Sequence, residues 1–218
     1  SGSYADKNAG IGKAFTVNAA TLADAGSGAS AGMASNYVLA TPSGVTGTVS
    51  KASINGVTGI VAQTRAYDGT ADATLDTGSA AYTGMVNGDS LTFSAATAVF
   101  NDKNAGSKTV SVNGIVLGGA DAGNYTLGNA TASGSGTITA KTLTLSRIAD
   151  KVYDGSSKAS FSQGVLNGLV GSEVLDISGS GSYADKNAGI GKAFTVTAAT
   201  LPDAGSGASA GMASNYVP

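Results

Sequence analysis

The chain contains no histidine, no cysteine and no tryptophan, and its only glutamate is Glu173. Without histidine and cysteine it lacks the usual ligands for zinc or haem, any disulfide, and any Ser-His-Asp or Cys-His catalytic arrangement. Charged residues make up 12% of the 218 positions, and 12 bases stand against 14 acids, so no basic surface for nucleic acid is indicated. We therefore expect a protein that is not an enzyme and that uses no cofactor and no nucleic-acid partner.

Proline is also scarce, with three residues, whereas glycine occupies 33 positions and apolar residues 42% of the chain. This apolar content argues against disorder, and the low proline count argues against a proline-rich linker. No apolar run is as long as a membrane span, so we expect no membrane insertion of this segment. The chain opens on Ser1 rather than methionine, which predicts a piece of a longer protein.

Short segments alternate between apolar and polar residues, as half-buried β-strands do. Clear examples are residues 14–18, 90–94, 109–113, 137–139 and 142–145. Asn-Gly, Asp-Gly and Gly-Asp pairs separate such segments and supply the backbone conformation of tight turns. No stretch has a helical period of useful length, so the predicted fold class is all-β.

An internal repeat dominates the sequence. Residues 2–38 recur as residues 181–217 with two changes, Asn18 to Thr197 and Ala23 to Pro202. A diverged version lies between them, so the repeating unit is about 90 residues long, the size of a small β domain. We frame a first repeat at residues 1–50, which is the C-terminal part of a unit. A complete middle repeat follows at 51–140, and a last repeat at 141–218 lacks its final strand.

Several short motifs recur in the same order within these repeats. The Tyr-Asp-Gly motif is Tyr67-Asp68-Gly69 and again Tyr153-Asp154-Gly155. In the middle repeat it is followed by three further motifs. They are Val86-Asn87-Gly88-Asp89, residues 101–106 (Asn-Asp-Lys-Asn-Ala-Gly), and residues 119–125, which end in Asn124-Tyr125. In this order the motifs resemble the YDG repeat family of large bacterial surface adhesins and haemagglutinin-like exoproteins. The resemblance implies a tandem surface module and supplies no catalytic residues.

We interpret the Tyr-Asp-Gly and Asn-Tyr motifs as structural. Asp and Gly close a turn, while the tyrosine packs its ring and hydrogen-bonds its hydroxyl. The predicted structural residues are Tyr67, Asp68, Gly69, Tyr153, Asp154, Gly155, Asn124 and Tyr125.

The Asp-Lys-Asn-Ala-Gly sequence occurs three times, at residues 6–10, 102–106 and 185–189. Its aspartates, Asp6, Asp102 and Asp185, are weak candidates for calcium ligands. A calcium loop needs several converging carboxylates, often with a closing glutamate, and these loops carry a lysine instead. The pattern favours a solvated turn and no metal.

Together these features predict small, immunoglobulin-like β-sandwich modules in an elongated tandem array. We expect a stalk or fibre-forming region of an extracellular bacterial adhesin or secreted matrix protein, which gives reach and self-association. Its partners would be adjacent repeats and possible further copies, arranged head-to-tail or laterally. The alternative is a module that binds glycans or another surface, although aromatic residues are only 6% of the chain.

Two further features bear on assembly. Insertions of glycine, serine and alanine at residues 27–35 and 206–214 are interpreted as tolerated loops. Residues 39–50 contain the final strand of the first repeat, which the last repeat lacks. We expect this strand to complete the last repeat of a neighbouring chain.

Overall fold

The computed structural model describes residues 1–26, 32–205 and 210–218. Strands account for 45% of the chain and helical turns for 4%, which confirms the prediction of an all-β protein. Among the described residues, none of the helices is long and apolar enough to cross a membrane. Parts of the two predicted insertion loops, residues 27–31 and 206–209, lie outside the described residues.

The chain forms two compact units, and both draw residues from the middle repeat. Unit 1 contains Ser1–Thr58, Ala80–Ala95 and Gly114–Ala130, and unit 2 contains Gly59–Ser79, Ala96–Asn113 and Thr131–Pro218. Each unit therefore includes one place where consecutive repeats meet.

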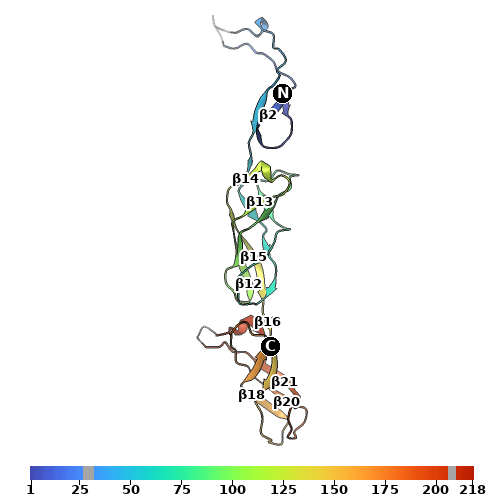
Figure 1. Ribbon diagram of the computed structural model, residues 1–218, viewed down its shortest axis with the longest axis vertical. Helices are drawn as coiled ribbons and strands as arrows, with labels where there is room; N and C mark the ends of the chain where they lie inside the picture. The colour runs from blue at the N-terminus through green and yellow to red at the C-terminus, as the bar shows by residue number, and fades with distance from the viewer. Residues whose placement is uncertain (27–31, 206–209) are drawn as a thin grey trace. The chain divides into compact units, whose positions relative to one another are not determined.

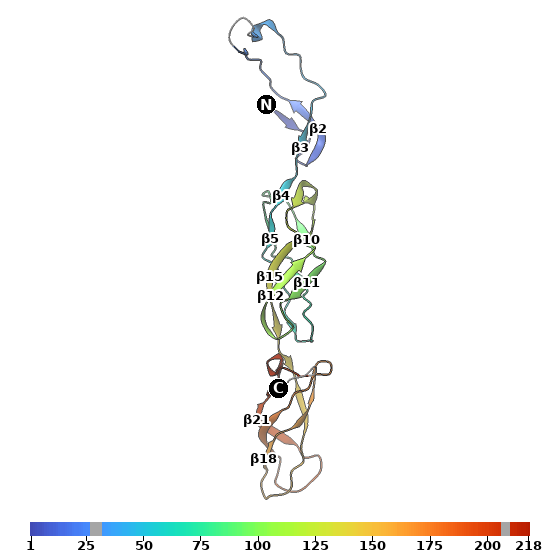
Figure 2. The same cartoon turned by 90° about the vertical axis from the view of Figure 1, so that its left-hand side faces the viewer.

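Unit 1 opens with a three-stranded antiparallel sheet in the order β1-β2-β3. Its strands are β1 (Gly2–Tyr4), β2 (Gly10–Val17) and β3 (Thr46–Val49). Phe15 and Val17 are half-buried on alternate positions of β2, as the sequence predicts. Tyr4 packs against Phe15 edge to face, with ring centroids 5.0 Å apart. In Figure 2, β3 runs beside β2.

Three strand pairs complete unit 1. They are β4 (Ala52–Ile54) with β14 (Tyr125–Leu127), β5 (Gly56–Thr58) with β9 (Ala81–Thr83), and β10 (Thr92–Ser94) with β13 (Val116–Gly118). The short 3-10 helices η1 (Ala34–Asn36) and η2 (Ala122–Asn124) also belong to this unit. Its core is a cluster around Ile54, Leu91 and Tyr125.

Unit 2 contains a six-stranded sheet whose longest strands, β12 and β15, lie side by side in Figures 1 and 2. Its strands are β6 (Val61–Ala62), β7 (Arg65–Ala66), β8 (Leu75–Asp76), β11 (Thr97–Phe100), β12 (Gly106–Asn113) and β15 (Thr131–Thr139). Val110 and Val112 alternate into the core as predicted, and Ile138 of the neighbouring strand β15 is also buried.

Two glycines of β15 allow other groups to approach it closely. A Cβ on Gly136 would lie 2.8 Å from Cβ of Ala62 and 2.9 Å from the ring of Phe100. A Cβ on Gly134 would lie 2.5 Å from the carbonyl oxygen of Ile60. β15 therefore needs glycine at positions 134 and 136, where the neighbouring atoms leave no room for a side chain.

The remainder of unit 2 comes from the last repeat. Its sheets are β16 (Lys141–Thr142) with β22 (Tyr216–Val217), β17 (Thr144–Ile148) with β19 (Gly164–Asn167), and β18 (Lys158–Phe161), β20 (Ser178–Tyr183) and β21 (Phe194–Thr200) in the order β18-β20-β21. The 3-10 helix η3 (Ala213–Asn215) precedes β22. Leu143, Phe161 and Ile177 are buried here.

Candidate functional site: the junction between repeats

The Tyr-Asp-Gly motif forms the same turn in both of its copies. In the middle repeat, Asp68 Oδ1 accepts the backbone N–H of Thr70 at 2.9 Å, and Gly69 has φ +84°. In the last repeat, Asp154 Oδ1 accepts the N–H of Ser156 at 2.9 Å, and Gly155 has φ +81°. The positive φ explains the glycine, and the side-chain acceptor explains the aspartate.

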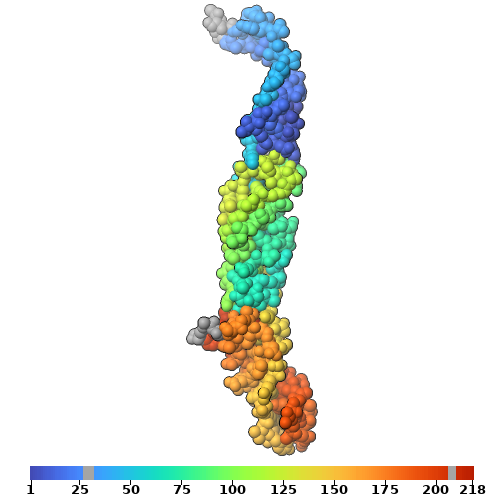
Figure 3. All heavy atoms as spheres, viewed as in Figure 1, coloured from blue at the N-terminus to red at the C-terminus, as the bar shows by residue number. Residues whose placement is uncertain are grey.

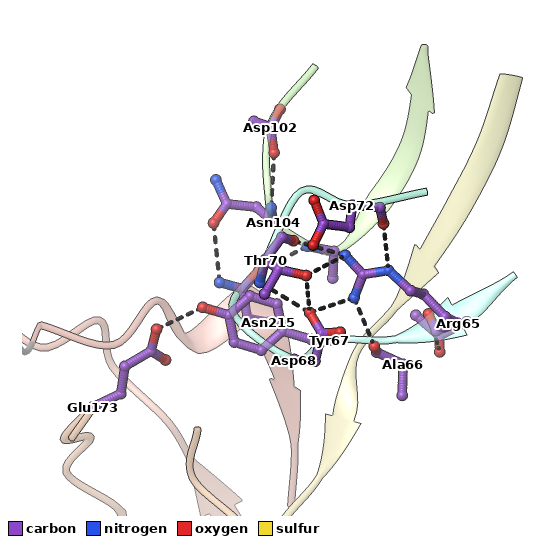
Figure 4. A network of polar contacts seen from close by, with 12 residues as sticks. Arg65, Ala66, Tyr67, Asp68, Thr70, Asp72, Asp102, Asn104, Glu173 and Asn215 are labelled. Atoms are coloured by element: carbon purple, nitrogen blue, oxygen red, sulfur yellow. Dashed lines mark hydrogen bonds and ion pairs between the residues drawn. The ribbon is translucent and has the colours of Figure 1, made fainter. Parts of the chain in front are cut away.

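Arg65 braces the turn in the middle repeat. Its guanidinium forms an ion pair with Asp68 at 2.5 Å and donates to the carbonyls of Thr70 at 2.7 Å and Asp72 at 3.1 Å. It also lies over the ring of Phe100, 5.5 Å from the centroid. Figure 4 shows the contacts of Arg65 with Asp68, Thr70 and Asp72. The aspartate and its turn are therefore held independently of the tyrosine.

Tyr67 packs on the repeat that follows its own, and its side chain is only 1% exposed. Its ring meets the ring of Tyr216 edge to face, with centroids 5.4 Å apart and planes at 82°. Its hydroxyl donates to Oε1 of Glu173 at 2.5 Å (Figure 4). The signature tyrosine of one repeat thus belongs to the junction with the next.

Glu173 is the acceptor at the centre of this junction. Its other oxygen accepts the hydroxyl of Tyr216 at 2.6 Å, and the ammonium of Lys103 lies 3.4 Å from Oε1. Burial raises the pKa of Glu173, but the hydrogen bonds from Tyr216, Tyr67 and Lys103 outweigh it and lower the pKa below its ordinary value. Burial and the bond to Glu173 raise the pKa of Tyr67 to about 12. The carboxylate is therefore kept charged and the phenol protonated.

An asparagine binds the Asp-Lys-Asn-Ala-Gly loop through two hydrogen bonds at the same junction. Asn215 is 1% exposed and ends the 3-10 helix η3, immediately before Tyr216. Its Oδ1 accepts the backbone N–H of Ala105 at 2.8 Å, and its Nδ2 donates to Oδ1 of Asn104 at 3.1 Å. The loop at residues 102–106 is therefore bound through its backbone and one side chain to the following repeat.

Unit 1 repeats this arrangement with different residue numbers. Asn124 ends η2, and its Oδ1 accepts the N–H of Ala9 at 2.9 Å while its Nδ2 donates to Asn8 at 3.1 Å. Lys7 of the same loop forms ion pairs with Asp89 at 2.6 Å and Asp121 at 2.9 Å. The first repeat thus docks on the middle repeat as the middle repeat docks on the last.

The tyrosine that follows each of these asparagines makes the same hydrogen bonds in both units. Tyr125 accepts the N–H of Val86 at 2.9 Å and donates to Asp89 at 2.7 Å. Tyr216 accepts the N–H of Val170 at 3.0 Å and donates to Glu173. Hydrogen bonds from Lys7 and Tyr125 lower the pKa of Asp89, so both junctions hold a charged carboxylate at the same place.

The third loop and the second signature tyrosine have no such partners among the described residues. Tyr153 is 60% exposed, and Asp185 to Gly189 are exposed as well. The prediction that Tyr153 packs its ring is therefore wrong for this chain. The physical reason is that the groups that cover Tyr67, namely Tyr216 and Glu173, belong to the repeat after its own, and the described residues place no such groups over Tyr153.

The three candidate calcium ligands lie beside lysines. Asp6 accepts the ammonium of Lys13, and Asp185 accepts that of Lys192. Asp102 forms an ion pair with Lys108 at 2.7 Å, which is the first cause of its lowered pKa. Within the described residues, no group of three or more carboxylates, histidines or cysteines is placed to hold a metal ion.

Sequence reasoning missed the loops as contact sites. The interpretation as solvated turns accounts for Asp185 but not for residues 6–10 and 102–106, which bind the next repeat. It also missed Glu173 and Lys7 as junction residues. The sequence did contain one signal for these contacts. The first two loops each precede an Asn-Tyr pair by a similar number of residues, 116 from Asn8 to Asn124 and 111 from Asn104 to Asn215.

These observations define an all-β protein of tandem repeats joined by a recurring polar junction. The model of the YDG domain matches residues 50–134 and 139–217, so the chain belongs to the YDG family. No curated protein and no solved structure matches the chain.

Proposed function

We propose that this chain is a structural segment, a tandem array of immunoglobulin-like β-sandwich modules in an elongated stalk or fibre. Its setting would be the surface or secreted matrix of a bacterium, as part of an adhesin, and it would perform no catalysis. The observation that carries this proposal is the repetition of one junction: Asn124 and Asn215 clasp identical loops with the same pair of hydrogen bonds.

A junction of this kind suits a segment that must hold its modules in register. Each one combines two hydrogen bonds between an asparagine and the loop of the preceding repeat with a lysine-carboxylate ion pair across the junction. Because the asparagine and the carboxylate lie on separate segments of the following repeat, rotation about the linker would break several of these contacts at once. Such a junction transmits orientation from one repeat to the next.

Small-angle X-ray scattering tests this proposal on the full chain. We expect the wild-type chain to scatter as a stiff, elongated particle. The double variant Asn124→Ala, Asn215→Ala should show the broader distance distribution of modules on flexible linkers. Asn36→Ala is the matched control, because Asn36 occupies the same repeat position but is exposed. Identical scattering from all three proteins would contradict the proposal.

The alternative of a glycan-binding module draws little support from the exposed aromatic residues. Tyr37 and Tyr153 are both exposed, and both occupy repeat positions that the junctions bury elsewhere, at Tyr216 and Tyr67. Among the described residues, neither of them has the covering groups that bury Tyr216 and Tyr67. Saturable binding on a glycan array, lost on Tyr153→Ala, would favour the alternative.

A further inference from the structure

The first strand of the middle repeat is held by a parallel partner within unit 1. β4 pairs with β14 over three residue pairs, from Ala52 with Tyr125 to Ile54 with Leu127. The N–H of Gly128 then donates to the carbonyl of Ile54 at 2.9 Å. Because the two strands run in the same direction, a pull on the N-terminal end of β4 slides it along β14, and the bonds of all the pairs bear the load together.

The partner strand is itself anchored in unit 1. Ile54 is fully buried and Tyr125 is 4% exposed, and both belong to the core cluster with Leu91. The hydroxyl of Tyr125 also accepts the N–H of Val86 at 2.9 Å and donates to Asp89 at 2.7 Å. Burial keeps competing water away from the strand pair on this side, and the tyrosine holds β14 to the rest of the unit.

The preceding repeat is attached to the same short segment. Asn124 lies immediately before β14 and accepts the N–H of Ala9 at 2.9 Å. In Figure 3 the dark-blue atoms of the N-terminal segment lie directly against the yellow-green atoms of the segment that contains Asn124. The chain also runs from the first repeat through residues 50–51 into β4. A pull on the first repeat therefore reaches residues 124–127 by two routes, through β4 and through Asn124.

Unit 2 has the same arrangement at the start of the last repeat. β16 pairs parallel with β22, Lys141 with Tyr216 and Thr142 with Val217. Asn215 lies immediately before β22 and binds the loop of the middle repeat. The sequence of β16, Lys-Thr, differs from that of β4, Ala-Ser-Ile. The two units therefore share the parallel pairing rather than the residues of the first strand.

We propose that each of these parallel pairs, β4 with β14 and β16 with β22, is a shear clamp whose function is to carry tension from one repeat to the next. Under a pull along the strands, the three residue pairs of β4 and β14 must separate together. Under a pull across the strands they separate one after another, which takes less force. This load-bearing role goes beyond the stiffness of the junctions, and it rests on the proposed function only for the source of the tension.

Single-molecule force spectroscopy with cysteine handles tests the clamp in unit 1. The chain has no cysteine, so two introduced cysteines define the points at which force is applied. Lys51→Cys with Gly128→Cys places the handles at opposite ends of the strand pair and loads it in shear. Lys51→Cys with Gly123→Cys is the matched control, because both handles lie at the same end and peel the pair apart. All three positions are exposed, and an added Cβ meets no atom closer than 3.5 Å at either glycine.

We expect the mean rupture force, at one pulling speed, to be at least about twofold higher in shear than in peeling, because three residue pairs share the load in shear. The clamp and the proposed function fail separately, since scattering measures the stiffness of the junctions and pulling measures the strength of one strand pair. Equal rupture forces in the two geometries, or a lower force in shear, would overturn the shear clamp.

Discussion

Tyr67 and Tyr153 occupy the same position of the repeat and have different surroundings. Their turns are alike, with an Asx bond and a positive-φ glycine in each. Only Tyr67 meets a following repeat, where Tyr216 and Glu173 cover it. The local structure of the turn is therefore the same in both repeats, whereas the burial of the tyrosine ring depends on contacts with the following repeat.

This difference predicts unequal costs for the same substitution. Tyr67→Ala should lower the free energy of unfolding by about 3–5 kcal/mol, because it removes a buried ring and one donor to Glu173. Tyr153→Ala should change it by less than about 0.5 kcal/mol, because that side chain is mostly exposed. Urea denaturation of both variants measures the two values, and equal losses would contradict the assignment of Tyr67 to a junction.

Glu173 predicts an acid-sensitive junction. Its folded-state pKa lies below the ordinary value of 4.5, so its contribution to stability is present above that pH and is lost as the pH falls through the folded pKa. Glu173→Gln should therefore be less stable than wild type at roughly pH 6–8, and the gap should close in acid. Melting temperatures between pH 2.5 and 8 measure this gap.

The control for that experiment is Asp150→Asn, because the Asp150 carboxylate is 91% exposed and its one ion pair among the described residues is with Arg147 at 3.5 Å. Its melting curve should follow wild type at every pH. The pH dependence of Tyr67 has the opposite direction: its pKa is raised to about 12, so its contribution to stability is present below about pH 10 and is lost as the pH rises through 12. If the difference in melting temperature between Glu173→Gln and wild type stays constant down to pH 2.5, the charge of Glu173 does not stabilise the junction.

At the scale of elements, the strands follow from sequence patterns that act locally. Alternation placed β2, β10, β12 and β15 correctly, since Val110, Val112 and Ile138 are buried on one face. The Asn-Gly and Asp-Gly pairs mark turns, with positive φ at Gly69, Gly88 and Gly155. The junction contacts could not be predicted in this way, because Ala9 and Asn124 are 115 residues apart and their bond depends on the packing of two repeats.

The glycines of β15 give a test at this scale. Gly136→Ala should destabilise the chain by about 1–3 kcal/mol, because its Cβ would lie 2.8 Å from Ala62 and 2.9 Å from the ring of Phe100. Gly56→Ala in β5 is the matched control: it has open space around the added Cβ and should be neutral or slightly stabilising. Thermal denaturation compares them, and a neutral Gly136→Ala would contradict the close packing of β15.

At the scale of the whole molecule, one contact recurs wherever one repeat follows another. Two copies of the Asp-Lys-Asn-Ala-Gly loop are held by an asparagine of the next repeat, and the third is exposed. The sequence repeats are therefore also structural connectors, each of which needs a successor.

Hydrogen exchange of three matched amides tests this account most directly. The N–H groups of Ala9, Ala105 and Ala188 have the same flanking residues, but within the described part of the chain only the first two are bonded, to Asn124 and Asn215. At low chain concentration we predict slow exchange at Ala9 and Ala105 and near-intrinsic exchange at Ala188. Asn215→Ala should release Ala105 and leave Ala9 protected. Equal exchange at all three amides would contradict the claim that these loops join consecutive repeats.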